Sequence, residues 1–70
     1  MTMKNEIRQI IDDEGVGGAV DILVLLADAL QDKANALYRD DKKGYALYTR
    51  RARHLYKTAN EILTGYFHGD

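Results

Sequence analysis

Apolar residues recur along two stretches of this chain at alternating intervals of three and four residues. The first stretch comprises Val16, Val20, Leu23, Ala27, Leu30, Ala34 and Leu37, and the second comprises Tyr45, Tyr48, Ala52, Leu55, Ala59, Ile62 and Tyr66. This interval keeps one side of an α-helix apolar along its whole length. Two such helices joined by a short polar link predict an antiparallel hairpin whose apolar sides face each other.

The sequence therefore predicts an all-α fold in a single domain over residues 1–70, with a short N-terminal helix before the hairpin. The three expected helices span about residues 3–13, 18–39 and 41–67. The glycines between positions 15 and 18 are expected to end the first helix, because glycine is unfavourable inside helices. Asp40 or Asp41 in the polar link is expected to cap the third helix.

The size of the chain predicts self-association. Seventy residues lie near the lower limit for independent folding, and the absence of Cys leaves no disulfide framework to support a small core. A second apolar stripe lies beside the first seam and consists of Ile22, Leu25, Ala29 and Ala36. A single partner helix cannot cover both stripes, so we expect a homo-oligomeric bundle of the four-helix type.

Charge is divided between the two long helices, although the net charge is only −1. All six charged residues between positions 12 and 32 are acidic, and all six between positions 42 and 57 are basic. One interpretation is that the two helices attract each other, within a chain or between subunits. The other is that the basic helix also holds an anionic ligand or partner.

The residues typical of catalytic and metal sites are sparse. Ser and Cys are absent, and the paired carboxylates Asp28 and Asp32 fall on the expected solvent side. His54, Glu61 and His68 follow one another at intervals of seven, whereas neighbouring metal ligands on a helix are three or four residues apart. We therefore expect no enzymatic activity, no metal and no cofactor.

A ligand site is expected on one shoulder of the third helix, where aromatic, basic and amide side chains gather. The candidate ligand-binding residues are Tyr45, Arg50, Arg53, Tyr56, Lys57 and Asn60. In this hypothesis Arg53 pairs with a phosphate together with Arg50 or Lys57, because guanidinium groups match phosphate geometry. Tyr56 stacks on a base and Asn60 supplies selectivity through its amide. The alternative is that these side chains form a hydrated helix–helix interface.

The leading hypothesis is a non-enzymatic, oligomeric helical binding protein that sequesters a small anionic, nucleotide-like ligand at its subunit interfaces. The alternative is a protein-binding adaptor or inhibitor that acts through an exposed helical face. Nucleic-acid binding ranks third, because the acidic second helix would repel phosphates. With no signal-peptide pattern and no apolar run long enough to span a bilayer, we expect a cytoplasmic protein.

Several short motifs resemble small, uncharacterised helical proteins of bacteria and phages. These motifs are the run Gly17-Gly18-Ala19-Val20, the step Leu26-Ala27-Asp28 and the spaced alanines Ala34, Ala52 and Ala59. The resemblance covers residues from Gly17 to about Leu63 and implies no particular activity.

Overall fold

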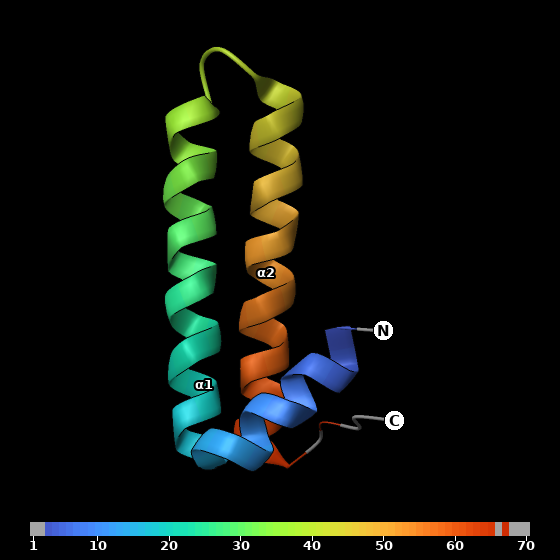
Figure 1. Ribbon diagram of the computed structural model, residues 1–70. Coiled ribbons are helices and arrows are strands. Elements are labelled where there is room, and N and C mark those ends of the chain that lie inside the picture. Colours follow the sequence, from blue (N-terminus) through green and yellow to red (C-terminus); the bar gives the residue numbers. More distant parts are fainter. Residues whose placement is uncertain (1–2, 66, 68–70) are drawn as a thin grey trace.

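The computed structural model describes residues 3–65 and 67 of the chain. Two helices, α1 (Met3–Leu37) and α2 (Lys42–Thr64), run antiparallel and pack along their length (Figure 1). The predicted all-α hairpin is therefore confirmed. Its two helices face each other because each has one continuous apolar side, and packing these sides together removes both from water.

Helix α1 bends sharply at a single residue, Gly15, whose φ of 78° and ψ of 171° are not helical. The segment before Gly15 crosses the lower end of α2, and Ile7 is buried there at 4% exposure (Figure 1). The predicted boundaries at residues 13 and 18 are wrong, since helical geometry extends to Glu14 and resumes at Val16. Of the three glycines in this run, Gly15 alone leaves the helical conformation, and Gly17 and Gly18 remain helical.

The helix ends next to the connecting turn differ slightly from the predicted ones. Helix α1 ends at Leu37 rather than at residue 39, and the Asp41 N–H donates to the Leu37 carbonyl at 2.8 Å. Of the two predicted N-cap residues, Asp40 and Asp41, the structure has Asp41 as the N-cap of α2. The Asp41 carboxylate accepts a hydrogen bond from the Gly44 N–H at 2.9 Å. This contact satisfies one of the free N–H groups at the start of the helix.

Helix α2 ends at Thr64, three residues before the predicted end at 67. Gly65 adopts a left-handed conformation with φ of 81°, which interrupts the helical backbone. Its N–H donates to the Ile62 carbonyl at 3.3 Å, and the Phe67 N–H donates to the Glu61 carbonyl at 3.1 Å. These bonds use carbonyls that the helix would otherwise leave without partners, which is a common way for a helix to end at glycine.

The core combines small residues in the hairpin with larger ones where the N-terminal segment crosses. The buried alanines of the two helices are Ala19, Ala27, Ala34, Ala52 and Ala59, which lets the two backbones approach closely. The buried larger residues are Ile7, Leu23, Leu55 and Ile62, and these four cluster with Ala27 and Ala59. The N-terminal segment therefore contributes to the same core as the hairpin.

Some residues of the predicted seams are not buried. Val16 is 48% exposed, because it directly follows the bend at Gly15, where α1 begins its new direction. Tyr45 and Tyr48 are half-buried, and Tyr66 lies outside the described residues. The tyrosines near the turn thus lie at the edge of the interface between the helices rather than in its centre.

Candidate functional site

Three of the predicted ligand-binding residues lie around one hollow on α2. Tyr45, Arg50 and Arg53 line it together with Ala46 and Thr49, and its volume is about 350 Å³. The Thr49 hydroxyl is buried and has no hydrogen-bond partner among the described residues. The hollow therefore offers two guanidinium groups next to an aromatic ring.

Tyr45 also has a structural contact at the turn between the helices. Its ring meets the ring of Tyr38 edge to face, with centroids 5.0 Å apart and planes at 74°. The Lys42 ammonium lies 5.8 Å from the centroid of the Tyr38 ring, within the range of a cation–π contact. The Tyr45 ring thus packs the connecting turn against the start of α2 and is already engaged in an aromatic contact.

Tyr56 bridges the two helices. Its hydroxyl donates a hydrogen bond to the carboxylate of Asp28 on α1. This bond raises the pKa of Tyr56 above its usual value of 10.0, with smaller contributions from desolvation and from the negative charges of Asp28 and Asp32. The predicted stacking residue is therefore engaged in the hairpin, and Asp28 is an acceptor rather than a purely solvated group.

The Tyr56–Asp28 bond predicts a loss of stability at high pH. Because folding raises the pKa of Tyr56, the bond contributes fully below the ordinary tyrosine pKa and is lost as pH rises through the raised value. Urea unfolding should show wild type to be more stable than Tyr56→Phe at about pH 8, with the difference shrinking at about pH 11. Tyr38→Phe, at a tyrosine that is 55% exposed, is the control. A wild-type advantage that is unchanged at high pH would contradict this assignment.

The remaining two predicted ligand residues stand apart from the hollow beside Tyr45. Lys57 and Asn60 are exposed on α2 and do not contribute to its lining. The structure therefore brings together Tyr45, Arg50 and Arg53, and it places Tyr56 in the interface between the helices.

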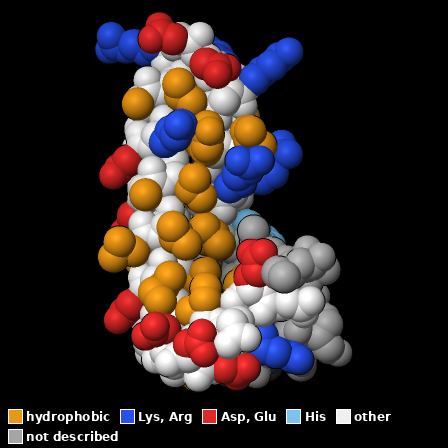
Figure 2. All heavy atoms as spheres, viewed as in Figure 1, with side chains coloured by type: hydrophobic (Ala, Val, Ile, Leu, Met, Phe, Trp, Pro, Cys, Tyr) orange, Lys and Arg blue, Asp and Glu red, His pale blue; other side chains and the backbone are white. Residues whose placement is uncertain are grey.

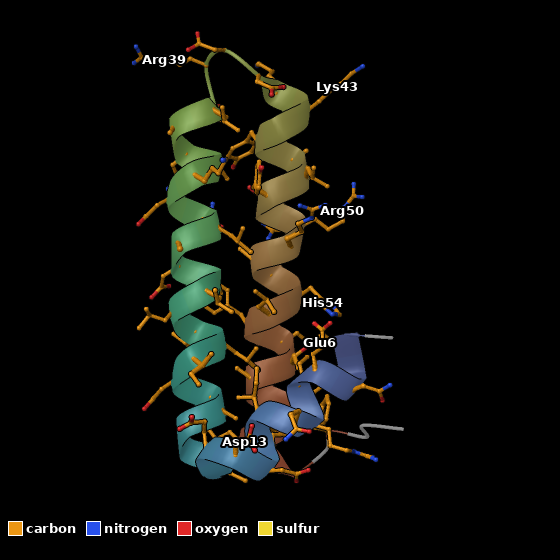
Figure 3. The ribbon with its side chains drawn as sticks, viewed as in Figure 1. Glu6, Asp13, Arg39, Lys43, Arg50 and His54 are labelled. Carbon is orange, nitrogen blue, oxygen red and sulfur yellow. The ribbon has the colours of Figure 1, made fainter. Side chains whose placement is uncertain are left out.

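A second hollow lies on the opposite shoulder of α2 and is called the basic hollow. It has a volume of about 320 Å³ and is lined by Leu30, Arg50, Arg51, His54 and Leu55. Arg50 and His54 project from the same side of α2 (Figure 3). The sequence pattern did not indicate this site, because its apolar floor combines Leu30 of α1 with Leu55 of α2 and exists only after the helices pair.

Cations also gather next to the basic hollow. The Lys33 ammonium lies 5.2 Å from the centroid of the Tyr48 ring, and the Arg51 guanidinium carbon lies 5.8 Å from the same centroid. Two positive groups thus share one aromatic ring, which attracts each of them, although they repel each other.

The outer face of α1 carries an uncovered apolar surface, the outer patch, which consists of Ile22, Leu25, Leu26 and Ala29. Leu25 is 71% exposed and Leu26 is 50% exposed. In the second apolar stripe, Leu25, Ala29 and Ala36 are exposed and Ile22 is half-buried, and the exposed Leu26 extends this surface. Hydrophobic side chains extend along the hairpin, with acidic groups on the α1 edge and basic groups on the α2 edge (Figure 2).

A metal centre is not evident in the part of the chain that the structure describes. No group of three or more His, Asp or Glu side chains lies close enough together there to bind an ion. His68, one of the three spaced residues considered for a metal, lies outside that part. Neither described helix is long and apolar enough to cross a membrane.

Comparison with protein-family models, curated proteins and solved structures finds no match to this chain. The resemblance to small helical proteins of bacteria and phages therefore rests on the sequence motifs alone. The surface features that can bind a ligand or a partner are the outer patch and the two hollows of α2.

Proposed function

We propose that this chain is a non-enzymatic helical binding module that self-associates through the outer patch of α1. The observation that carries the proposal is the exposure of neighbouring apolar side chains on that face, with Leu25 the most exposed at 71%. Single exposed leucines are ordinary, but a contiguous apolar group on a helix is typical of an interaction surface.

A second copy of the chain is the occupant that the charges favour. Acidic residues predominate between positions 12 and 32, on the helix that carries the outer patch, and basic residues predominate between positions 42 and 57 of α2. Identical chains thus carry both members of a complementary pair of surfaces, which favours contact of α1 in one copy with α2 in another. The small core supports the same conclusion, because a domain of this size gains relatively little stability from its own packing.

The oligomeric state of Leu25→Glu tests this proposal. Sedimentation velocity at micromolar concentration should show the wild type as a dimer or larger assembly and Leu25→Glu as a monomer, because the new carboxylate loses hydration in the contact. Leu63→Glu is the matched control, since Leu63 is 66% exposed but lies on α2 outside the patch. The melting temperature of the wild type should also rise with its own concentration.

Two results would contradict self-association through this patch. The first is a wild type that remains monomeric, which would leave the patch available to a different protein and favour the adaptor or inhibitor hypothesis. The second is dissociation of Leu63→Glu to the same extent as Leu25→Glu, because the effect would then not be specific to α1.

A second candidate function is the binding of a small anionic ligand at the hollow beside Tyr45. Arg50 and Arg53 are the cations of this hollow, and the buried Thr49 hydroxyl there lacks a partner among the described residues. An anion bound in the hollow would supply a partner for both guanidinium groups. A nucleotide panel that leaves the melting temperature unchanged at millimolar concentration would remove this candidate.

A further inference from the structure

We propose that the basic hollow of one copy receives the outer patch of another, with Leu25 on the apolar floor and aspartates against the basic rim. This inference rests on the proposed self-association and names the surface that meets the patch. The two surfaces lie on different parts of the chain, because the outer patch belongs to α1 and most of the hollow belongs to α2. The contact is therefore head to tail.

The floor of the basic hollow fits an apolar side chain. Leu30 of α1 and Leu55 of α2 form this floor, and the volume of the whole hollow is about 320 Å³. Pockets for small ligands begin at about 300 Å³, so the hollow has room for one or two side chains rather than for a large molecule. Leu25, the most exposed leucine of the chain, has the shape and the chemistry for this floor.

The arginines at the rim of the basic hollow have no carboxylate partner among the described residues. Arg50, Arg51 and His54 line it, and Arg51 shares the Tyr48 ring with Lys33. Within residues 3–65 and 67, neither Arg50 nor Arg51 has an ion pair. A carboxylate brought by another copy would relieve the repulsion between these cations and pair with a guanidinium group.

The two arginines of the rim differ in the surfaces to which they contribute. Arg50 lines both the basic hollow and the hollow beside Tyr45, whereas Arg51 lines the basic hollow but not the other. Charge reversal of Arg51 therefore changes the basic hollow without changing the lining of the hollow beside Tyr45.

The outer face of α1 carries acidic groups in the matching arrangement. Asp21, Leu25, Asp28 and Asp32 follow one another at intervals of four, three and four residues and so form one line along the helix. Asp28 accepts the hydrogen bond of Tyr56, which leaves Asp21 and Asp32 as the carboxylates that flank Leu25 and can meet arginines. A leucine between two aspartates complements an apolar floor with an arginine rim.

A head-to-tail contact has a consequence that a symmetric contact lacks. Each copy uses its patch toward one neighbour and its hollow toward the other, so the contacts continue as an open chain or close into a ring. A variant with a damaged patch retains an intact hollow, and a variant with a damaged hollow retains an intact patch. Mixing the two variants leaves one good contact between unlike chains.

Sedimentation of charge-reversed variants tests the inference. Arg51→Glu should weaken assembly about tenfold or more, because it places a negative charge against aspartates of the next copy. Lys43→Glu is the matched control, since Lys43 is exposed on the same helix but lines neither hollow of α2, and it should assemble like the wild type. Adding Asp32→Lys to Arg51→Glu should restore assembly. Leu25→Glu mixed with Arg51→Glu should form a one-to-one complex that does not grow further.

The outcomes separate this inference from the proposed function. If Leu25→Glu leaves the wild-type assembly intact, self-association through the patch is wrong. If Leu25→Glu dissociates the assembly while Arg51→Glu sediments like the wild type, the patch is used but the hollow is not, and this inference is overturned. Failure of the mixed variants to form a complex, with both still helical by circular dichroism, would overturn it as well.

Discussion

Leu23→Ala is expected to leave most of the protein unfolded at room temperature. Leu23 is only 2% exposed and belongs to the cluster that joins the N-terminal segment to the hairpin, together with Ile7 and Leu55. Removal of a buried leucine side chain costs about 2–5 kcal/mol through lost apolar burial and the cavity that remains. A core of this size supplies only about 3–5 kcal/mol, so the loss is comparable with the whole stability.

Leu63→Ala is the matched control for this substitution. It removes the same atoms from a leucine that is 66% exposed, so it creates no cavity and should change the free energy of unfolding by less than about 0.5 kcal/mol. Helical circular dichroism as a function of urea compares both variants with the wild type at one protein concentration. A Leu23→Ala variant as stable as Leu63→Ala would mean that the cluster around Leu23 does not form the core.

Gly15→Ala is expected to destabilise the protein by about 1–3 kcal/mol, because its φ of 78° and ψ of 171° lie in a region that only glycine occupies readily. A Cβ atom placed on Gly15 would meet nothing within 4 Å, so the expected cost comes from the backbone alone. The strain acts at the bend that brings Ile7 onto the lower end of the hairpin. The amides of the N-terminal segment should therefore exchange with solvent faster in this variant.

Gly17→Ala is expected to have the opposite effect. Gly17 is helical, and a Cβ atom there would also meet nothing within 4 Å. Alanine should stabilise the protein by about 0.4–1 kcal/mol, because it restricts the unfolded chain more than glycine does. Urea unfolding of the two variants gives a direct comparison, since they add the same methyl group two residues apart. A stabilising Gly15→Ala would show that the bend is not formed as described.

Much of the hairpin could be predicted from the local pattern of the sequence. The spacing of Leu23, Ala27 and Ala34 on one helix and of Ala52 and Leu55 on the other predicted which sides are buried, and all five are. The pattern is informative because a helix repeats every 3.6 residues, so spacing alone decides which residues share a side. The same reasoning predicted that the partner helix cannot cover Leu25 and Ala29, and both are exposed in the hairpin.

The helix ends were predicted less accurately. Four closely spaced residues, Gly15-Val16-Gly17-Gly18, indicated a break but not which glycine would form it. Backbone conformation at one position depends on where the flanking helices must go, and here Ile7 has to reach the hairpin core. The end of α2 at Thr64 was missed for a related reason, since Gly65 can continue a helix or end it.

The candidate site depended even more strongly on tertiary structure. The shared face of Tyr45, Arg53 and Tyr56 on one helix was read from spacing, but the hydrogen bond of Tyr56 to Asp28 joins residues on different helices. The basic hollow likewise needs Leu30 of α1 beside Leu55 of α2. Spacing within a helix carries no information about the register between two helices.

The sequence by itself determined that two helices form, which side of each is apolar, and that acidic and basic residues are separated between them. The first two properties depend on residues three or four positions apart, and the third follows directly from the residue types in each stretch. Tertiary structure decided the bend at Gly15, the engagement of Tyr56 and the position of the basic hollow. Each of these depends on contacts between residues far apart in the chain, and such contacts exist only once the two helices have packed in one register.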